Sequence, residues 1–262
     1  MSRPGRNSTE RASKSHAKML FIIAIPLVLM LAGLGYWYFL RYVPSGRWAY
    51  YAAIRTDPET FARHMLQPGM RCGNAPFAFP TSGVAIGLWD QSYHIGHRHA
   101  GIDIFSGTEP GVTAVYAAYP GYLTRLPEWR ASVIIRIPSD PLNPGRQIWT
   151  YYTHLANQGG DSFISDEFPA GTFEAPVKAG TFLGYMGDFS GDPGNPTGLH
   201  LHFSVVKDDG QGGFANELKI RNTYDPSPYF HLPLNHRENP NDIPFCEQEI
   251  TYEHWDLVSA NE

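Results

Sequence analysis

An uncharged, strongly apolar run near the N-terminus limits what every other part of this chain can be. Met19 to Leu40 contains no charged side chain, and a helix of that length would extend roughly 33 Å, enough to cross the hydrocarbon core of a bilayer. Five basic residues and one acidic residue precede the run, and Tyr36, Trp37 and Tyr38 lie where an outer aromatic belt forms. We therefore expect a basic cytoplasmic tail over residues 1–18, one transmembrane helix over 19–40, and an outer location for everything that follows.

A cleaved signal peptide is the alternative interpretation of the same run. Small residues at Ala32, Gly33 and Gly35 would suit a cleavage site, but the apolar stretch is long for the hydrophobic region of a signal peptide. Both interpretations export the rest of the chain, where a disulfide is permitted. Cys72 and Cys246 could therefore pair or remain independent thiols, and two cysteines are too few for a four-cysteine zinc site.

The exported part has the composition of a mainly β domain. The chain has 26 glycines and 22 prolines, which interrupt helices, and 14% aromatic residues, a balance that favours short strands and shaped loops. The basic tail carries a net charge of +4, which leaves −9 for the rest of a chain of net charge −5. An acidic body of this kind argues against a nucleic-acid partner.

Sequence patterns divide the exported part into three segments. Residues 41–75 are expected to form a short helical stalk or linker, since Asp57 suits a helix N-cap and Pro58 a first helical position. Residues 76–225 contain the strand-like runs, and residues 226–262 are expected to form a C-terminal surface wrap. The expected strands are Gly101 to Phe105, Val112 to Ala118, Gly121 to Leu126, Ser132 to Ile137, Ile148 to Thr153, Thr181 to Met186 and Leu199 to Val206.

Three short stretches contain the informative histidines. They are HIGHRHAGID at His94 to Asp103, YYTHL at Tyr151 to Leu155 and GLHLHF at Gly198 to Phe203. Residues two apart on a strand face the same side, so His200 and His202 would share one face. His99 and Asp103 would be roughly 13 Å apart on a straight strand, so the chain must bend between them, and Gly101 can supply the bend. His99, Asp103 and one of His200 or His202 then form an open metal site with room for water.

Each signal has an ordinary structural explanation when it is taken alone. A His-x-His pair more often lies on a solvated edge strand than on a metal, and a carboxylate such as Asp103 at the start of a strand more often caps a turn. The metal interpretation therefore depends on the three stretches occurring together in one chain.

In that combination and order, the motifs His-x-x-x-Asp, Tyr-x-His-Leu and His-x-His resemble the lysostaphin-type (LytM-like) zinc endopeptidases, which cut peptidoglycan cross-bridges. The resemblance covers roughly Pro80 to Lys207. It implies a compact antiparallel β-sheet metallopeptidase domain with a groove and peptidoglycan peptides as substrate. Together with the expected transmembrane helix, this gives the periplasmic or cell-wall side of the cell membrane as the expected location of the domain. The site residues that the resemblance implies are His99, Asp103 and His202 as ligands of one zinc ion and His154 and His200 as the catalytic pair.

The implied mechanism is hydrolysis by water. Zinc can lower the pKa of a bound water towards about 7, and an imidazole can accept or return the proton. The chain has no His-Glu-x-x-His helix to supply a glutamate base, so His200 is the expected base and His154 the expected oxyanion or proton-transfer partner. Tyr152 either adds a hydrogen bond at the site or is an ordinary packed strand tyrosine.

Two departures from the family pattern leave the choice of substrate open: the stretch from Ala156 to Ala175 is long, and no cell-wall targeting domain follows the motifs. Two alternative functions are also open. One alternative is a catalytically silent adapter of the same fold that binds and activates another cell-wall hydrolase, and a regulatory protein partner is possible for an active enzyme too. The other alternative is an iron(II) site for oxygen chemistry, which uses the same two-histidine, one-carboxylate ligand set.

Overall fold

The structure is a computed structural model, and it describes residues 25–37, 50, 53–54, 56–92 and 96–258. The chain divides into two units, Met1–Val43 and Pro44–Glu262. Within the first unit, residues 25–37 form a helix. The predicted basic tail lies outside the described residues, and the predicted transmembrane helix over 19–40 extends beyond them at both ends. No helix in the described part of the chain is long and apolar enough to cross a membrane, so the spanning helix stays a prediction.

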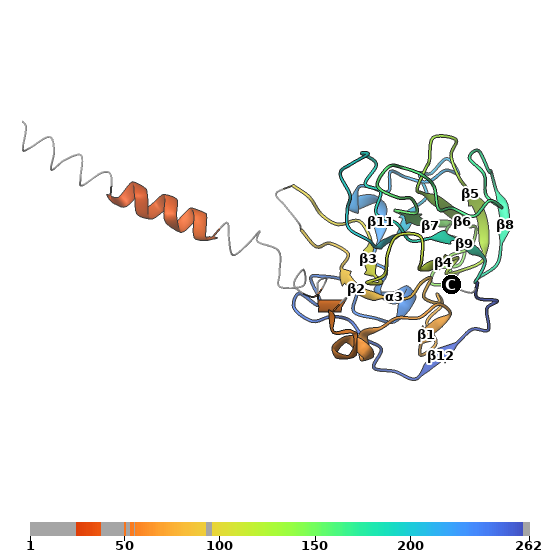
Figure 1. Cartoon of the computed structure of the whole chain (residues 1–262), viewed down its shortest axis with the longest axis horizontal. Helices are drawn as coiled ribbons and strands as arrows, with labels where there is room; N and C mark the ends of the chain where they lie inside the picture. Colours follow the sequence, from red (N-terminus) through yellow and green to blue (C-terminus); the bar gives the residue numbers. More distant parts are fainter. Residues whose placement is uncertain (1–24, 38–49, 51–52, 55, 93–95, 259–262) are drawn as a thin grey trace, which may run out of the picture. The chain divides into compact units, whose positions relative to one another are not determined.

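The second unit is built around one antiparallel sheet of eight strands (Figure 1). Its strands in sheet order are β2 (Val84–Gly87), β3 (Ile102–Phe105), β10 (Leu201–Lys207), β7 (Ile148–Thr153), β6 (Val133–Ile137), β5 (Gly121–Thr124) and β8 (Ala175–Val177), with β11 (Thr223–Tyr224) paired to β10. Every pairing in this sheet is antiparallel. The expectation of a mainly β, antiparallel fold is therefore confirmed.

Two smaller sheets and several short helical elements are also described in this unit, and residues 50, 53–54 and 56 are helical as well. The smaller sheets are β4 (Ala114–Tyr116) with β9 (Phe182–Tyr185), and β1 (Met70–Cys72) with β12 (Ile250–Tyr252). The helical elements are the 3-10 helices η1 (Pro58–His64) and η2 (Ile220–Asn222) and the α-helix α3 (Ser227–Phe230).

The two faces of the central strands have different roles. Phe203 on β10 and Tyr152 on β7 are fully buried on the core face, where Phe203 packs against Phe77 and Phe230. Since side chains alternate along a strand, His202 and its neighbours in register point to the opposite face. That opposite face carries the candidate site.

The segment that leads into the sheet packs on it rather than standing apart. Asp57 caps η1, and its side chain accepts a hydrogen bond from the Thr60 N–H at 3.4 Å, so the predicted N-cap is confirmed. Phe61 is 3% exposed and packs with Val84 and Ile86 of β2. The helix is of the 3-10 type, and the domain boundaries at residues 41, 75 and 225 stay predictions.

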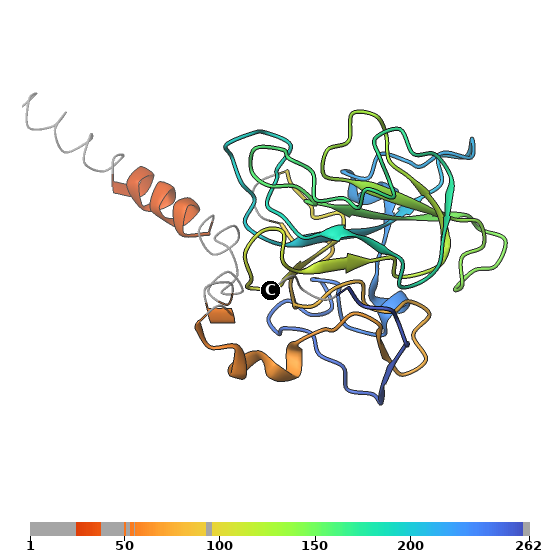
Figure 2. The same cartoon turned by 45° about the vertical axis from the view of Figure 1, so that its right-hand side comes forward.

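The C-terminal segment is tied back to the start of the domain. β12 pairs with β1, and Cys72 and Cys246 form a disulfide. The segment around β1 and the dark blue C-terminal segment therefore run side by side in both views (Figures 1 and 2). The pairing of the two cysteines, which the sequence left open, is thus settled in favour of a disulfide.

A second part of the C-terminal segment holds the turn that follows β2. The Trp89 N–H donates to the Leu234 carbonyl at 3.0 Å, and the His236 N–H donates to the Trp89 carbonyl at 2.9 Å. Arg237 forms an ion pair with the buried Asp90. The same turn is hydrogen-bonded to the backbone of His99, because the Asp90 N–H donates to the His99 carbonyl at 2.9 Å.

Candidate metal and catalytic site

Strand register brings Asp103 and His202 together. The two residues are directly opposite each other in the β3–β10 pairing, and His202 also faces Thr153 of β7. His99 reaches them from the loop before β3, where the chain bends at Gly101. A Cβ at Gly101 would lie 2.2 Å from the Phe203 carbonyl oxygen, so only glycine lets this loop approach β10. The predicted bend at Gly101 is confirmed, and its main physical reason is close backbone contact.

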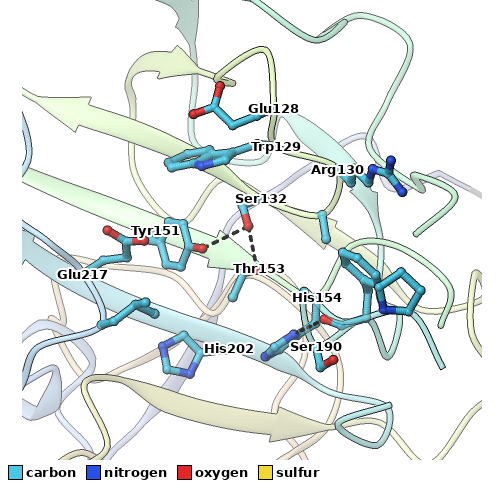
Figure 3. A pocket seen from close by; sticks show the side chains of 15 residues that line it. Glu128, Trp129, Arg130, Ser132, Tyr151, Thr153, His154, Ser190, His202 and Glu217 are labelled. Carbon is cyan, nitrogen blue, oxygen red and sulfur yellow. Dashed lines mark hydrogen bonds between the residues drawn. The ribbon is translucent and has the colours of Figure 1, made fainter. Parts of the chain in front are cut away.

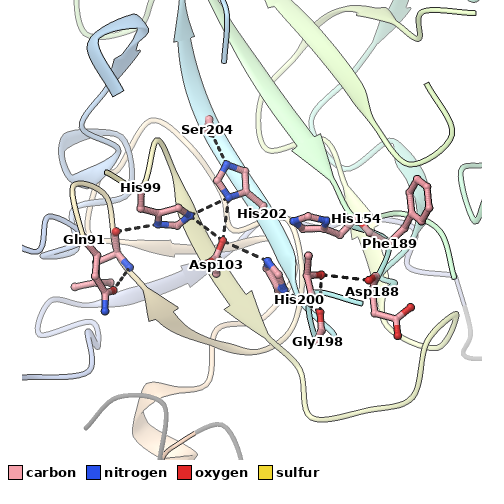
Figure 4. A network of polar contacts seen from close by, with 12 residues as sticks. Gln91, His99, Asp103, His154, Asp188, Phe189, Gly198, His200, His202 and Ser204 are labelled. Atoms are coloured by element: carbon pink, nitrogen blue, oxygen red, sulfur yellow. Dashed lines mark hydrogen bonds and ion pairs between the residues drawn. The ribbon is translucent and has the colours of Figure 1, made fainter. Parts of the chain in front are cut away.

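Three donor atoms converge at this point (Figure 4). His99 Nε2 lies 3.0 Å from Asp103 Oδ1, His202 Nδ1 lies 2.9 Å from the same oxygen, and the two nitrogens are 3.0 Å apart. Ligands of a tetrahedral zinc ion at bond lengths of about 2.0–2.1 Å are about 3.3–3.4 Å from one another. The triangle therefore has nearly the size that a zinc ion requires, and these residues fit a metal.

The outer ring nitrogens orient the two histidines for this role. His99 Nδ1 donates to the Leu88 carbonyl at 2.9 Å, which leaves a lone pair on Nε2 of the neutral ring. His202 Nε2 lies 2.9 Å from Ser204 Oγ, which accepts from it in the tautomer that leaves Nδ1 facing Asp103. Metal-binding histidines are commonly held in this way by a second hydrogen bond. Neutral His99 and the Asp103 carboxylate present only lone pairs to each other, so a proton or a cation must lie between them.

His154 and His200 flank the triangle with their reactive nitrogens free to face it. His154 Nδ1 donates to the Phe189 carbonyl at 2.6 Å and His200 Nδ1 to the Gly198 carbonyl at 3.0 Å. The two rings are 4.4 Å apart between centroids, and His200 Nε2 is 3.5 Å from Asp103 Oδ1. His154 adopts a left-handed backbone conformation, with φ of 73°, which is uncommon for a residue other than glycine. That turn redirects the chain immediately after β7 and aims the His154 ring at His200.

Burial sets the charge states of this cluster. Burial lowers the pKa of His154 to about 3, with His200 acting in the same direction, and lowers the pKa of His202 to about 4 against the opposing effect of Asp103. Burial also lowers the pKa of His200. Burial is the largest effect on His99 and lowers its pKa, but the charge of Asp103 and the hydrogen bonds to Asp103 and the Leu88 carbonyl together raise it. The charges of His99 and His200 hold the pKa of Asp103 well below its ordinary value despite burial. Around neutral pH, His154 and His200 are therefore uncharged and able to accept a proton.

A groove of about 600 Å³ runs past His154 and His202 (Figure 3). Its walls come from the loop after β5, the outer face of β7, the loop after β9 and the loop after β10. The groove expected from the sequence resemblance is present and lies beside the three donor atoms.

The tyrosine of this site is not the one considered from the sequence. Tyr152 is fully buried in the core, and its hydroxyl accepts from the Ala118 N–H at 2.9 Å, so its suggested role at the site is wrong. Tyr151 lies on the groove face instead and is bonded to Ser132 at 2.9 Å. Tyr152 lies two residues before His154, so regular strand alternation would place both side chains on one face of β7, but the left-handed conformation of His154 breaks this alternation. Thr153 is paired with His202 in register, and the residue two before it, Tyr151, shares its face of the strand.

All five site residues considered from the sequence are brought together, and their chemical roles stay predictions. The fold and site define an antiparallel β domain with a group of two histidines and one carboxylate that could hold a metal ion, two further histidines and a groove. No family model and no curated protein matches this chain.

Solved structures do match. Lysostaphin from Staphylococcus simulans, described as an antimicrobial peptidase, is 20% identical with a TM-score of 0.35, and the match covers 60% of this chain and 50% of that one. A putative glycyl-glycine endopeptidase lytM from Ruminococcus gnavus is 22% identical with a TM-score of 0.35, covering 60% of each chain. The catalytic domain of the prophage-encoded M23 protein EnpA from Enterococcus faecalis is 25% identical with a TM-score of 0.31, covering 55% of this chain and 91% of that one.

These names agree with the lysostaphin-type resemblance carried by the motifs. The chain spans only half to 60% of the first two matched structures, and all the TM-scores are below 0.5. The matches thus say what the chain is similar to.

Proposed function

We propose that this protein is a zinc-dependent endopeptidase that hydrolyses peptide bonds in the cross-links of peptidoglycan. The observation that carries the proposal is the convergence of His99 Nε2, Asp103 Oδ1 and His202 Nδ1 within 3.0 Å of one another, with two neutral histidines beside them. A groove leads to the same point. The motif resemblance supports peptidoglycan peptides as the substrate class.

The proposed reaction divides the work among five side chains. His99, Asp103 and His202 would hold the metal, and a bound zinc ion would supply Lewis acidity for the scissile carbonyl and for water. His200 accepts the proton of the attacking water, which its lowered pKa and its Nε2 position 3.5 Å from Asp103 Oδ1 support. His154 stabilises the developing oxyanion or passes the proton to the leaving amine.

The membrane anchor is part of the proposal. The uncharged run Met19 to Leu40 and the basic residues before it support one spanning helix with the catalytic domain on the periplasmic or cell-wall side. A regulatory protein partner that controls access to the groove is compatible with this arrangement.

The deciding experiment is mass spectrometry of purified cross-linked peptidoglycan incubated with the full-length protein in detergent. New peptide ends that disappear with a chelator, and that His202→Ala does not produce, would establish a metal-dependent endopeptidase and identify its bond. Intact peptidoglycan in the presence of stoichiometric bound zinc would refute hydrolysis and favour the adapter function. Activity that requires iron and oxygen instead of zinc would favour the oxygenase.

A further inference from the structure

One end of the groove combines apolar walls with two carboxylates, those of Glu217 and Glu128. Trp129, Tyr151 and Glu217 lie together at this end (Figure 3), and the Trp129 and Tyr151 rings are 5.6 Å apart between centroids in an edge-to-face arrangement. Leu218 follows Glu217 in the chain and also lines the groove. Leu218 is 75% exposed, so its aliphatic side chain is open to contact with a bound molecule. This end is therefore shaped to receive something with an apolar stem.

Glu217 is partly buried in the groove wall. Within the described residues it forms no side-chain hydrogen bond and no ion pair, and Figure 3 shows its carboxylate beside the Tyr151 ring. Its charge contributes to the raised pKa of Tyr151, after the larger effect of burial. A partly desolvated carboxylate without a partner is an electrostatic site for a cation.

The opposite end of the groove has the opposite charge. Arg130 lines that end near His154 and Ser190, and it also has no ion-pair partner among the residues that the structure describes (Figure 3). His154 and His202 line the same groove. The groove is thus polarised, with carboxylates at the end formed by Trp129 and Tyr151 and a guanidinium near His154.

We propose that Glu217, Trp129 and Leu218 form a specificity subsite for a substrate residue whose aliphatic side chain ends in an ammonium group. The methylene stem would lie along Leu218 and the Trp129 ring, and the ammonium would pair with Glu217 while contacting the aromatic faces. Arg130 would receive a carboxylate from the other side of the scissile bond and so fix the direction of the peptide. The assignment rests on the proposed function, because it places this residue next to the bond that is cut.

The test compares two forms of one probe. A cross-linked stem-peptide dimer released from peptidoglycan is used as it is, or after its free amines have been acetylated, which removes the positive charge and retains the peptide. The wild-type protein should cleave the native dimer with a kcat/KM about fivefold higher than the acetylated dimer, the size expected for one partly exposed ion pair. Glu217→Gln should remove this preference, and Glu217→Lys should reverse it.

The control variant is Glu238→Gln, an exposed carboxylate outside this groove, which should keep the wild-type preference. Equal kcat/KM for both dimers in the wild-type protein, or a preference that survives Glu217→Gln, would overturn the subsite. If neither dimer is cleaved, the proposed function fails, and the subsite is judged by binding of the two dimers in fluorescence anisotropy. Equal affinities of wild type and Glu217→Gln for the native dimer would then overturn it.

Discussion

In each histidine of the site, one ring nitrogen is hydrogen-bonded to a backbone carbonyl or a hydroxyl, and the other faces the centre of the site. His99, His154 and His200 are fixed by backbone carbonyls, while His202 is held by the hydroxyl of Ser204. A backbone carbonyl is still present after any side-chain substitution. Among these four hydrogen bonds, only the one from His202 to Ser204 can therefore be removed by changing the partner residue.

Ser204→Ala should weaken zinc binding by roughly 10- to 100-fold, the usual cost of losing a second contact to a metal ligand. The measurement is competition with a chromogenic chelator. Ser132→Ala is the matched control, because its hydroxyl lies on the same face but bonds Tyr151 and Thr153. Unchanged affinity in Ser204→Ala would contradict the assigned orientation of His202.

The metal ligands and the catalytic pair should separate in their effects. His200→Ala should reduce kcat by about 10²- to 10⁴-fold, the range for loss of a general base, and should leave most metal binding intact. His202→Ala should lose both activity and metal, since it removes one of three ligand atoms. Metal content by atomic spectroscopy and peptide release by mass spectrometry give the two readouts, and equal metal loss in both variants would break this division of roles.

Metal-free protein should lose stability as the pH falls from 6.5 to 5.5. His154 and His202 have pKa values of about 3 and about 4 in the folded state against an ordinary 6.5, so the unfolded chain takes up protons that the folded chain does not. The free energy of unfolding should fall by about 1 to 3 kcal/mol across this interval. Asp103 contributes only below its ordinary pKa of 3.8, and the raised pKa of His99 costs stability only above pH 6.5.

Urea unfolding in EDTA at several pH values measures this effect. His154→Gln should show a shallower dependence than the wild-type protein, because it lacks one of the two groups. A free energy of unfolding that stays level or rises over the interval would show that these rings are protonated in the folded state.

At the scale of strands and turns, the sequence was informative where a strand has a strong pattern of its own. The β-branched and aromatic runs predicted β3, β4, β5, β6, β7, β9 and β10, and Ile148–Thr153 was predicted with its observed ends. Strands of two to four residues such as β11, β1 and β12 were missed. Their pairing joins positions as distant as Met70 and Tyr252, and no local periodicity encodes such a partner.

The site was predictable to a similar extent. The two-residue spacing of His200 and His202 predicted that their side chains lie on one face of a strand. The resemblance to the lysostaphin-type endopeptidases then indicated His202 as the metal ligand. Tyr151 was missed because the left-handed residue His154 resets the alternation that the strand pattern assumes. Glu217 and Arg130 reach the groove from loops separated in sequence, and nothing near either residue indicates that they line one cavity.

Gly101→Ala should destabilise the fold, because the new methyl group would meet the Phe203 carbonyl oxygen at 2.2 Å and Ser204 Oγ at 2.5 Å. We expect a loss of about 1 to 3 kcal/mol in the free energy of unfolding, together with weaker metal binding as His99 shifts. Gly159→Ala is the control, since its nearest neighbour is the flexible Asn157 side chain at 3.3 Å. Equal stability of the two variants would mean that the His99 loop does not need its close approach to β10.

At the scale of the whole chain, the Cys72–Cys246 disulfide closes a loop with a sequence separation of 174 residues. The replacement of both cysteines by alanine should lower the free energy of unfolding by about 3 to 5 kcal/mol, because a loop of this length restricts the unfolded chain strongly. Urea unfolding of the oxidised wild-type protein and of the double variant provides the comparison. A difference below about 1 kcal/mol would show that β1, β12 and the core alone hold the C-terminal segment.

The contact between the C-terminal segment and the turn after β2 has a practical consequence for anyone who wants a shortened version of this protein. The resemblance ends near Lys207 and the predicted domain ends at residue 225, so a gene trimmed at that predicted boundary would stop near residue 225. Such a fragment would lack Leu234, His236 and Arg237, which secure Trp89 and Asp90, and through them the backbone of His99. A minimal expression design should therefore continue through Tyr252, which retains these contacts together with Cys246 and the β1–β12 pairing, even though no residue beyond Lys207 belongs to the motifs.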